Sequence, residues 1–195
     1  MNPEISRKIV HLVALLIPIL YYFLPRNTSL LILTLFTAAF LIIDFVRLQV
    51  GTFKKLFLLL FGQLLRRKEL HTLTGGSYLL IASLVSMLVF SKSVFIPAML
   101  FLVVGDTVAA LFGLRYGRIR IFRKTIAGTS ACLISCLIIA YIVSKLPNAR
   151  LPLGIGIVGA VIATIVEALP VEVNDNVIIP ISTGIIMQIL KSIYV

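Results

Sequence analysis

Seven apolar stretches, separated by short polar segments, limit what this chain can fold into more than any other feature. The chain is 60% hydrophobic and only 13% charged, which is typical of polytopic membrane proteins, and its 195 residues fit a single domain, residues 1–195. We therefore expect an all-α polytopic integral membrane protein with about seven transmembrane helices. The stretches are Ile9–Leu24, Leu30–Val46, Ser77–Phe90, Val94–Leu114, Ala127–Ser144, Leu153–Leu169 and Val177–Ile193.

The segment Phe53–Lys68 contains an additional apolar run that is too short to cross a hydrocarbon layer of roughly 30 Å. It has Lys54 and Lys55 near one end and three consecutive cations, Arg66 to Lys68, at the other. Cations at both ends of a short apolar run favour one interfacial amphipathic helix that lies among the lipid headgroups.

Basic residues are distributed unequally between the two sides of the predicted bundle. With a cytoplasmic N-terminus, thirteen Lys and Arg residues fall on the cytoplasmic side and five on the other. This bias predicts that the N-terminus is cytoplasmic and the C-terminus is not. It also explains the net charge of +11, so we expect no nucleic-acid partner. Cys132 and Cys136 share one helical face, which favours packing over metal binding.

Asp106 is an ionisable residue within the fourth apolar stretch. A charge at that depth costs roughly 2.5–3.5 kcal/mol on insertion scales, so it is a candidate functional residue. Its oxygens suit Mg²⁺, and Gly105, Gly113 and Gly117 would let a phosphate approach closely. The alternatives are helix packing for the glycines and an ion pair with a neighbouring span for Asp106.

Two cations and an imidazole share one face of the first helix, because Arg7, Lys8 and His11 are spaced three and four residues apart. Such a group can hold phosphate oxygens. Ordinary anchoring by positive residues at the cytoplasmic surface is the alternative.

A basic loop connects the fourth stretch to the fifth. It ends in Arg123 and Lys124, followed by Thr125 and Gly128, so cations lead directly into a helix N-terminus. Free amide groups and the helix dipole attract anions at such a position. The loop lacks the Gly-x-x-x-x-Gly-Lys pattern of a Walker loop, but it favours binding of a triphosphate. The positive-inside bias is the alternative explanation of its arginines.

The connection between the sixth and seventh stretches is acidic, although it lies on the basic side of the membrane. Glu167, Asp175 and Asn176 bring oxygen ligands to the side on which we place Asp106. The three carboxylates predict a site for one or two metal ions that orients a hydroxyl nucleophile. Capping of the seventh helix by Asn174 or Asp175 is compatible with that role.

Two weaker features lie between the second and third stretches. Glu69 and Thr74 are candidates for a turn that lines the site and contacts substrate, with a flexible loop as the alternative. Asp44 and Arg47, three residues apart at a helix end, predict a local ion pair.

These motifs resemble, in their order along nearly the whole chain, those of the CTP-dependent lipid-alcohol kinases: dolichol kinase, phytol kinase and the CTP-dependent diacylglycerol kinase. That family is also similar to phosphatidate cytidylyltransferases. The matching pieces are Arg7-Lys8-Ile-Val-His11, Gly105-Asp106 with Gly113 and Gly117, Lys124-Thr125-Ile-Ala-Gly128-Thr129, and Glu167 followed by Asp175-Asn176 and Pro180.

The resemblance implies a membrane-embedded CTP-dependent lipid kinase domain, residues 1–195, with CTP and a membrane lipid alcohol as partners. The alcohol would be a polyprenol or dolichol, a phytol-like isoprenoid or a diacylglycerol. Asp106, Glu167 and Asp175 would hold Mg²⁺, and Asp106, Lys124 and Asp175 would be catalytic. The nucleotide-binding residues are then Arg7, Lys8, Gly105, Gly113, Gly117, Arg123, Lys124, Thr125, Gly128 and Asn176. His11 is a weaker candidate for contact with substrate, as are Glu69 and Thr74, which the matching pieces do not include.

Two other functions are compatible with the sequence. A cytidylyltransferase would use CTP to make a CDP-lipid, and a small transporter or lipid carrier would use the buried charges as an ion path. The loop charges predict the cytoplasmic membrane as the location, with the active site facing the cytoplasm. A homodimer is left open as the assembly.

Overall fold

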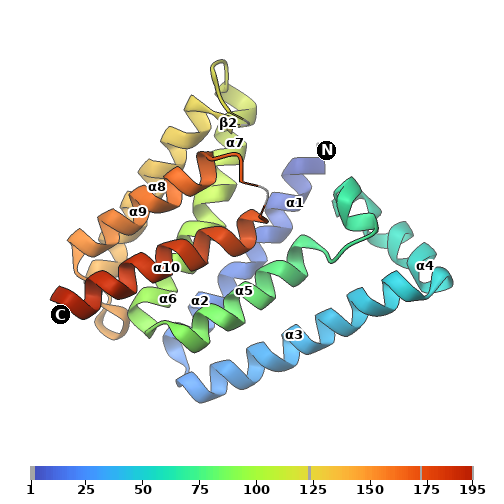
Figure 1. Ribbon diagram of the computed structural model, residues 1–195, viewed down its shortest axis with the longest axis horizontal. Helices are drawn as coiled ribbons and strands as arrows, with labels where there is room; N and C mark the ends of the chain where they lie inside the picture. Colours follow the sequence, from blue (N-terminus) through green and yellow to red (C-terminus); the bar gives the residue numbers. More distant parts are fainter. Residues whose placement is uncertain (1–2, 123, 172, 195) are drawn as a thin grey trace.

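A computed structural model of the chain describes residues 3–122, 124–171 and 173–194. Helices run back and forth between two ends of the molecule (Figure 1). The elements are α1 (Pro3–Leu12), η1 (Val13–Leu15), α2 (Leu16–Phe23), α3 (Arg26–Gln49), α4 (Gly51–Phe61), η2 (Gly62–Leu64), η3 (Arg67–Leu70), α5 (Gly75–Val89), α6 (Lys92–Leu100), η4 (Phe101–Gly105), α7 (Asp106–Tyr116), β1 (Arg120–Ile121), β2 (Lys124–Thr125), α8 (Ile126–Lys145), η5 (Pro147–Ala149), α9 (Leu153–Ala168) and α10 (Asp175–Tyr194).

Each of the seven predicted apolar stretches is helical in the structure. Five helical segments are long and apolar enough to cross a membrane: Glu4–Phe23, Arg26–Gln49, Lys92–Tyr116, Ile126–Lys145 and Asp175–Tyr194. The other two, Gly75–Val89 and Leu153–Ala168, are shorter apolar helices. A mainly α-helical fold with several helices that could cross a membrane is therefore confirmed, while the count of seven spans and the orientation stay predictions.

The structure corrects two details of the expected all-α fold. A short antiparallel hairpin, β1–β2, pairs Arg120 with Thr125 between α7 and α8. The predicted interfacial helix also ends early, since α4 stops at Phe61 and the chain then forms the 3₁₀ turns η2 and η3. Gly62, a weak helix former, directly follows the last residue of α4.

The centre of the bundle is the continuous segment α6–η4–α7. In its most apolar part 72% of the residues are buried, against 33% or less in the other four long helices. Phe95, Met99 and Leu102 are fully buried and anchor this core. The outer helices expose large apolar side chains, such as Leu31 and Leu35 of α3, which suits contact with lipid.

The helix α8 packs closely on α7 through small residues. A Cβ at Gly128 would lie 2.7 Å from the Ala109 carbonyl oxygen, and one at Gly105 would lie 2.8 Å from Cys136 Sγ. Cys132 and Cys136 are free and buried, which confirms their expected role in packing. The α7–α8 pair is therefore a close helix contact of the small-residue type.

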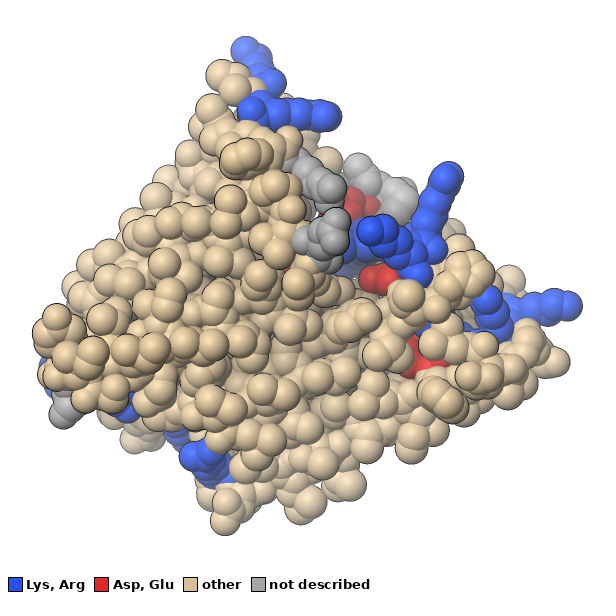
Figure 2. Space-filling model, viewed as in Figure 1, with Lys and Arg blue, Asp and Glu red and all other residues tan. Residues whose placement is uncertain are grey.

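The polar connections gather at one end of the bundle. The start of α1, the β1–β2 hairpin and the start of α10 all lie toward this end (Figure 1). Figure 2 shows that acidic side chains visible from this side lie close to basic ones in a notch at the same end. At the opposite end, Arg26 donates to the Met87 and Leu88 carbonyls and Lys92 donates to the Leu24 carbonyl, so basic side chains satisfy helix C-termini there.

Candidate active site

Asp106 is the first residue of α7 and directly follows η4, a short π-helix. A π-helical turn holds more residues than an α-helical turn, so it changes the direction in which the following side chains point, and such turns are frequent at functional sites. The residue is 6% exposed. The apolar pattern of residues 101–105 does not distinguish a π-helix from an α-helix, so this feature was not predicted.

Lys8 of α1 donates a hydrogen bond to Asp106 Oδ2. Both side chains are buried, with 8% and 7% exposure. His11, one turn further along α1, places Nε2 3.9 Å from the same oxygen. Among the described residues this nitrogen is buried and has no hydrogen-bond partner. The predicted Lys8–His11 face and Asp106 therefore come together across the bundle, and the ion pair of Asp106 with a neighbouring span, given above as an alternative, is present.

A second group of charges surrounds Lys124 at the end of the hairpin. Lys124 Nζ donates to Glu167 Oε1 at 2.7 Å and lies 3.7 Å from Asp175 Oδ2. Burial by itself lowers the pKa of Lys124, but Glu167 first, and then Asp106 and Asp175, raise that pKa above its ordinary value. Lys124 is thus a protonated amine among the three predicted metal-binding carboxylates.

The start of α10 is fixed by its two asparagines. Asn174 Oδ1 accepts a hydrogen bond from the Asn176 amide at 3.0 Å, which confirms the predicted cap. The Asn176 side-chain amide donates to the Gly75 carbonyl at 2.8 Å, so it joins α10 to the first residue of α5. This contact holds Asp175 beside the loop that precedes α5.

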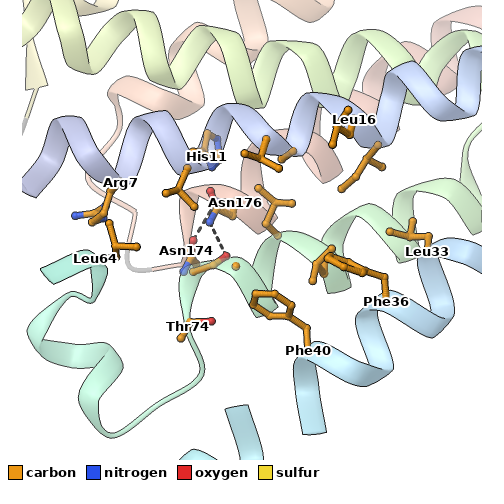
Figure 3. Close-up of a pocket in the computed structure, with 18 of the residues that line it drawn as sticks. Arg7, His11, Leu16, Leu33, Phe36, Phe40, Leu64, Thr74, Asn174 and Asn176 are labelled. Atoms are coloured by element: carbon orange, nitrogen blue, oxygen red, sulfur yellow. Dashed lines mark hydrogen bonds between the residues drawn. The ribbon is translucent and has the colours of Figure 1, made fainter. Parts of the chain in front are cut away.

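A groove of about 590 Å³ begins at these polar groups and runs between α1–α2, α3 and α5. In Figure 3, Phe36, Phe40 and Leu33 of α3 lie across the groove from Leu16, while Arg7, His11 and Asn176 lie at its polar end. The polar lining includes Arg7, Lys8, His11, Asp106, Asp175 and Asn176, and the apolar lining includes Leu20, Leu24, Leu33, Phe36, Phe40 and Met87. A groove of this size and composition suits a small-molecule ligand with one polar end.

The donor set fits Mg²⁺ in part. Within the described residues, no three His, Cys, Asp or Glu side chains are close enough to form a complete metal site. Mg²⁺, however, usually takes only one or two carboxylates and completes its shell with water and substrate phosphate. Glu167 Oε2 is buried and lacks a hydrogen-bond partner in the described part of the chain, so it is an oxygen able to accept a cation.

The predicted glycines lie apart from the groove. A Cβ at Gly113 would lie 2.9 Å from Thr125 Oγ1, and Gly117 and Gly128 also face Thr125, so all three serve the junction of α7 with α8. Thr125 caps α8 by accepting from the Gly128 amide at 3.1 Å. Packing explains Gly105, Gly113, Gly117, Gly128 and Thr125, and their contact with a nucleotide stays a prediction.

Of the two arginines predicted to bind nucleotide, the structure describes one. Arg7 lines the polar end of the groove and forms an ion pair with Glu4 at 2.8 Å. Arg123 lies outside the described residues. The structure contains one chain, so the homodimer stays a prediction.

Comparison with known proteins finds relatives by sequence but no solved structure to compare with this fold. No family model matches the chain, and no solved structure matches it. The chain is 30% identical over 184 residues to an uncharacterized protein of Rickettsia prowazekii, RP860, an alignment that covers 92% of this chain and 90% of the relative. The chain belongs to the family of that protein.

The chain is also distantly similar to named kinases. The chain is 29% identical over 170 residues to CTP-dependent diacylglycerol kinase 1 of Saccharomyces cerevisiae and 28% identical over 171 residues to the protein of the same name from Eremothecium gossypii. The alignments cover 75% and 76% of this chain but only 59% and 54% of the relatives, so the chain spans little more than half the length of either kinase. The similarity supports a distant relation to CTP-dependent lipid kinases.

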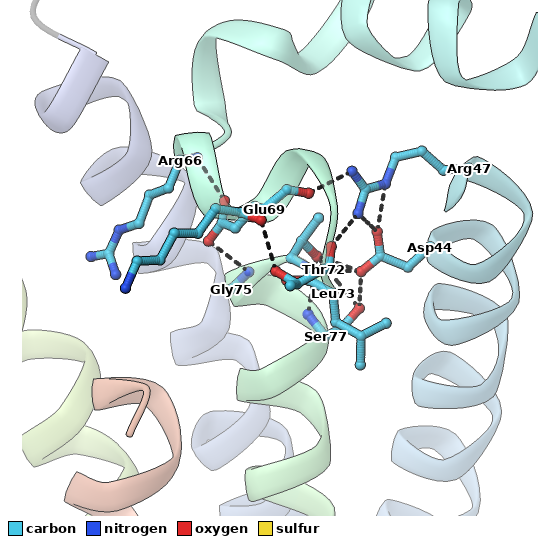
Figure 4. Close-up of polar contacts among 10 residues, drawn as sticks. Asp44, Arg47, Arg66, Glu69, Thr72, Leu73, Gly75 and Ser77 are labelled. Atoms are coloured by element: carbon cyan, nitrogen blue, oxygen red, sulfur yellow. Dashed lines mark hydrogen bonds and ion pairs between the residues drawn. The ribbon is translucent and has the colours of Figure 1, made fainter. Parts of the chain in front are cut away.

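The turn before α5 is more ordered than the sequence suggests. Arg47, with 0% exposure, forms the predicted ion pair with Asp44 and also donates to the Glu69 and Thr72 carbonyls (Figure 4). Asp44 Oδ2 accepts from the Thr74 amide and hydroxyl and from the Ser77 hydroxyl. The ion pair was predicted, but its long-range partners were not.

Through this network the weaker candidates Glu69 and Thr74 reach the groove. Glu69 accepts from the Arg66 and Gly75 amides, and both Glu69 and Thr74 line the groove. The predicted turn therefore lies at the site. The carboxylate of this turn, Glu69, already accepts hydrogen bonds from backbone amides of the same turn. This favours a role in holding the groove wall.

Proposed function

We propose that the protein transfers the γ-phosphate of CTP to the hydroxyl of a membrane lipid alcohol. The observation that carries this proposal is the junction of an apolar groove with the charged groups Lys8–Asp106 and Lys124–Glu167–Asp175. The apolar groove suits the lipid that carries the hydroxyl, and the charged groups suit a metal-bound triphosphate. The names of the two kinase relatives support CTP as the donor.

Phosphoryl transfer requires positioning and charge stabilisation more than covalent help from the protein. Lys124, with Arg7 and Lys8, would neutralise the triphosphate. One or two of the carboxylates Asp106, Glu167 and Asp175 would hold Mg²⁺, which would supply positive charge to the phosphate oxygens. Asn176 would orient the nucleotide beside Asp175.

The acceptor hydroxyl would lie at the polar end of the groove, next to Asp106 and to His11 Nε2, which accepts and donates no hydrogen bond among the described residues. The lipid oxygen forms a bond to the γ-phosphorus while the bond from that phosphorus to the bridging oxygen breaks. CDP leaves with the bonding electrons, and the hydroxyl proton passes to a carboxylate of the site.

The loop charges support an active site that faces the cytoplasm, where soluble CTP arrives. The acidic side chains visible in Figure 2 lie toward one end of the bundle, whereas an ion path would need acidic groups across its depth. This distribution favours an enzyme over a transporter or carrier.

The position of a radioactive label decides between kinase and cytidylyltransferase. Purified protein is incubated with Mg²⁺, CTP and a panel of diacylglycerol, phytol, geranylgeraniol and polyprenols, and in a parallel reaction with the phosphorylated form of each lipid. Label from γ-phosphate CTP should enter one of the lipids, and label from α-phosphate CTP should not. Transfer of the α-label to a phosphorylated lipid would establish the cytidylyltransferase instead, and absence of γ-label from every alcohol would refute the kinase.

A further inference from the structure

The groove continues far beyond the charged groups at its entrance. Its lining extends along α1 and α2 from His11 to Leu24. At 1.5 Å per helical residue, these positions span about 20 Å. The groove is therefore much longer than a hydroxyl group and its first carbons require.

The walls of the long part are apolar and come from three elements. Leu20 belongs to α2 and Leu24 directly follows that helix, Leu33 and Phe36 belong to α3, and Met87 belongs to α5. The one hydroxyl of α3 on this stretch, Ser29, donates to the Pro25 carbonyl at 3.1 Å. A hydrocarbon chain suits such walls because it has no hydrogen-bonding groups. Water or a polar ligand would have donors and acceptors that find no hydrogen-bond partner there.

Near Leu24 and Met87, at the far end of the groove lining, two basic side chains bind helix C-terminal carbonyls. Arg26 donates to the Met87 and Leu88 carbonyls, and Lys92 donates to the Leu24 carbonyl. These bonds join α3 to α5 and α6 to α2 beside Leu24 and Met87. The groove lining ends beside these joined helix termini, which sets the length over which the protein can contact a chain.

We infer that the groove holds one hydrocarbon chain of the acceptor lipid and limits its length. The hydroxyl lies near Asp106 and His11, and the chain runs between α2, α3 and α5 toward Leu24 and Met87. This inference rests on the proposed function for the identity of the acceptor. The ligand class is a long-chain lipid alcohol with a chain of about 20 Å inside the protein; a second chain, where present, stays in the bilayer.

A photoreactive lipid tests the binding mode without requiring phosphate transfer. The purified full-length protein in lipid nanodiscs is illuminated with a long-chain alcohol that carries a diazirine at its methyl end, and the labelled residues are found by mass spectrometry. Label should concentrate on Leu24, Ile32 and Met87, which line the far half of the groove. Label mainly on Leu31 and Leu35, the outward residues of α3, would show ordinary annular lipid and overturn the inference.

A matched pair of variants tests the length limit. Ile32 lines the groove and is 46% exposed, while its neighbour Leu31 is 61% exposed and does not line it. Ile32→Trp should lower transfer to the long-chain alcohol by about tenfold or more, as expected for a filled apolar subsite, and spare an alcohol of half that length. Leu31→Trp should change neither rate.

The variant assay and the photolabelling test this inference separately from the proposed function. Equal loss for both chain lengths in Ile32→Trp, or no loss for either, would refute the length limit even in an active kinase. If the wild type phosphorylates no alcohol, the kinase proposal fails, and the photolabelling pattern still decides whether the groove holds a hydrocarbon chain.

Discussion

Lys8 donates a hydrogen bond to Asp106, a residue 98 positions later in the chain, and both side chains are buried. The contact joins the first helix to the central one and neutralises a carboxylate that would otherwise be isolated in an apolar environment. Removing one member of such a pair is costly because the other charge stays buried and unpaired. The pair thus has a structural role in addition to any role in chemistry.

A double-mutant cycle separates the two roles. Lys8→Met and Asp106→Asn should each destabilise the protein by about 3–5 kcal/mol, since each leaves one unpaired buried group. The double variant Lys8→Met/Asp106→Asn should recover much of that loss, because no charge remains unpaired. Thermal unfolding can be followed with a thiol-reactive dye that reaches the buried Cys132 and Cys136 only on unfolding.

Activity in the same double variant gives the second half of this prediction. We expect no phosphate transfer despite restored stability, since neither the carboxylate nor the amine is present. Wild-type activity in the double variant would show that the pair is purely structural.

The Asp44–Arg47 pair should act on stability. Asp44→Ala leaves Arg47 buried with one of its partners removed, and we expect a loss of about 3–5 kcal/mol. The matched control is Arg118→Ala at an exposed position, which should stay within about 0.5 kcal/mol of the wild type. An unchanged melting temperature for Asp44→Ala would mean that the network does not hold the turn before α5.

Replacement of two glycines by alanine should change the stability of the protein in opposite directions. Gly128→Ala would place a Cβ 2.7 Å from the Ala109 carbonyl oxygen, which must push α7 and α8 apart at a cost of about 1–3 kcal/mol. Gly154 lies in α9, where an added Cβ would meet nothing within 4 Å, so Gly154→Ala should stabilise by about 0.4–1 kcal/mol. Dye-based melting of both variants checks the contrast, and tolerance of Gly128→Ala would argue against close packing there.

Lys124 should stay charged throughout the working pH range. Its pKa is raised in the folded protein by Glu167, Asp106 and Asp175. A raised lysine pKa contributes stability that is complete below the unfolded-state pKa and is lost only as the pH rises through the folded-state pKa. Between about pH 6 and pH 9 the pH–rate profiles of the wild type and Lys124→Arg should therefore have the same shape. A basic limb in this range that moves in Lys124→Arg would contradict the assignment.

Local features of the fold were predictable because local physics determines them. The apolar stretches predict the helices, Asn174 caps α10 as expected, and Asp44 and Arg47 pair across one helical turn. The contacts of Lys8 with Asp106 and of Lys124 with Glu167 depend on how distant helices pack. Sequence reasoning placed these residues on one side of the membrane but could not pair them.

Other features were ambiguous or hidden in the sequence. Gly113 suited both phosphate contact and helix packing, and only its distance to Thr125 favours packing. The π-helix before Asp106 has no distinctive composition. The groove is formed by Leu24, Phe36 and Met87, whose side chains are ordinary for membrane helices, so its existence depends on three helices being held apart.

The most decisive measurement compares Asp106→Asn with Thr107→Val in transfer of the γ-phosphate of CTP to lipid alcohol, at equal amounts of folded protein. The two residues are adjacent and buried, and the Thr107 hydroxyl donates only to the Val103 carbonyl of its own helix, at 2.6 Å, among the described contacts. If Asp106 serves the chemistry, Asp106→Asn should lose γ-phosphate transfer while Thr107→Val keeps it. Full γ-phosphate transfer by folded Asp106→Asn would exclude Asp106 from the active site.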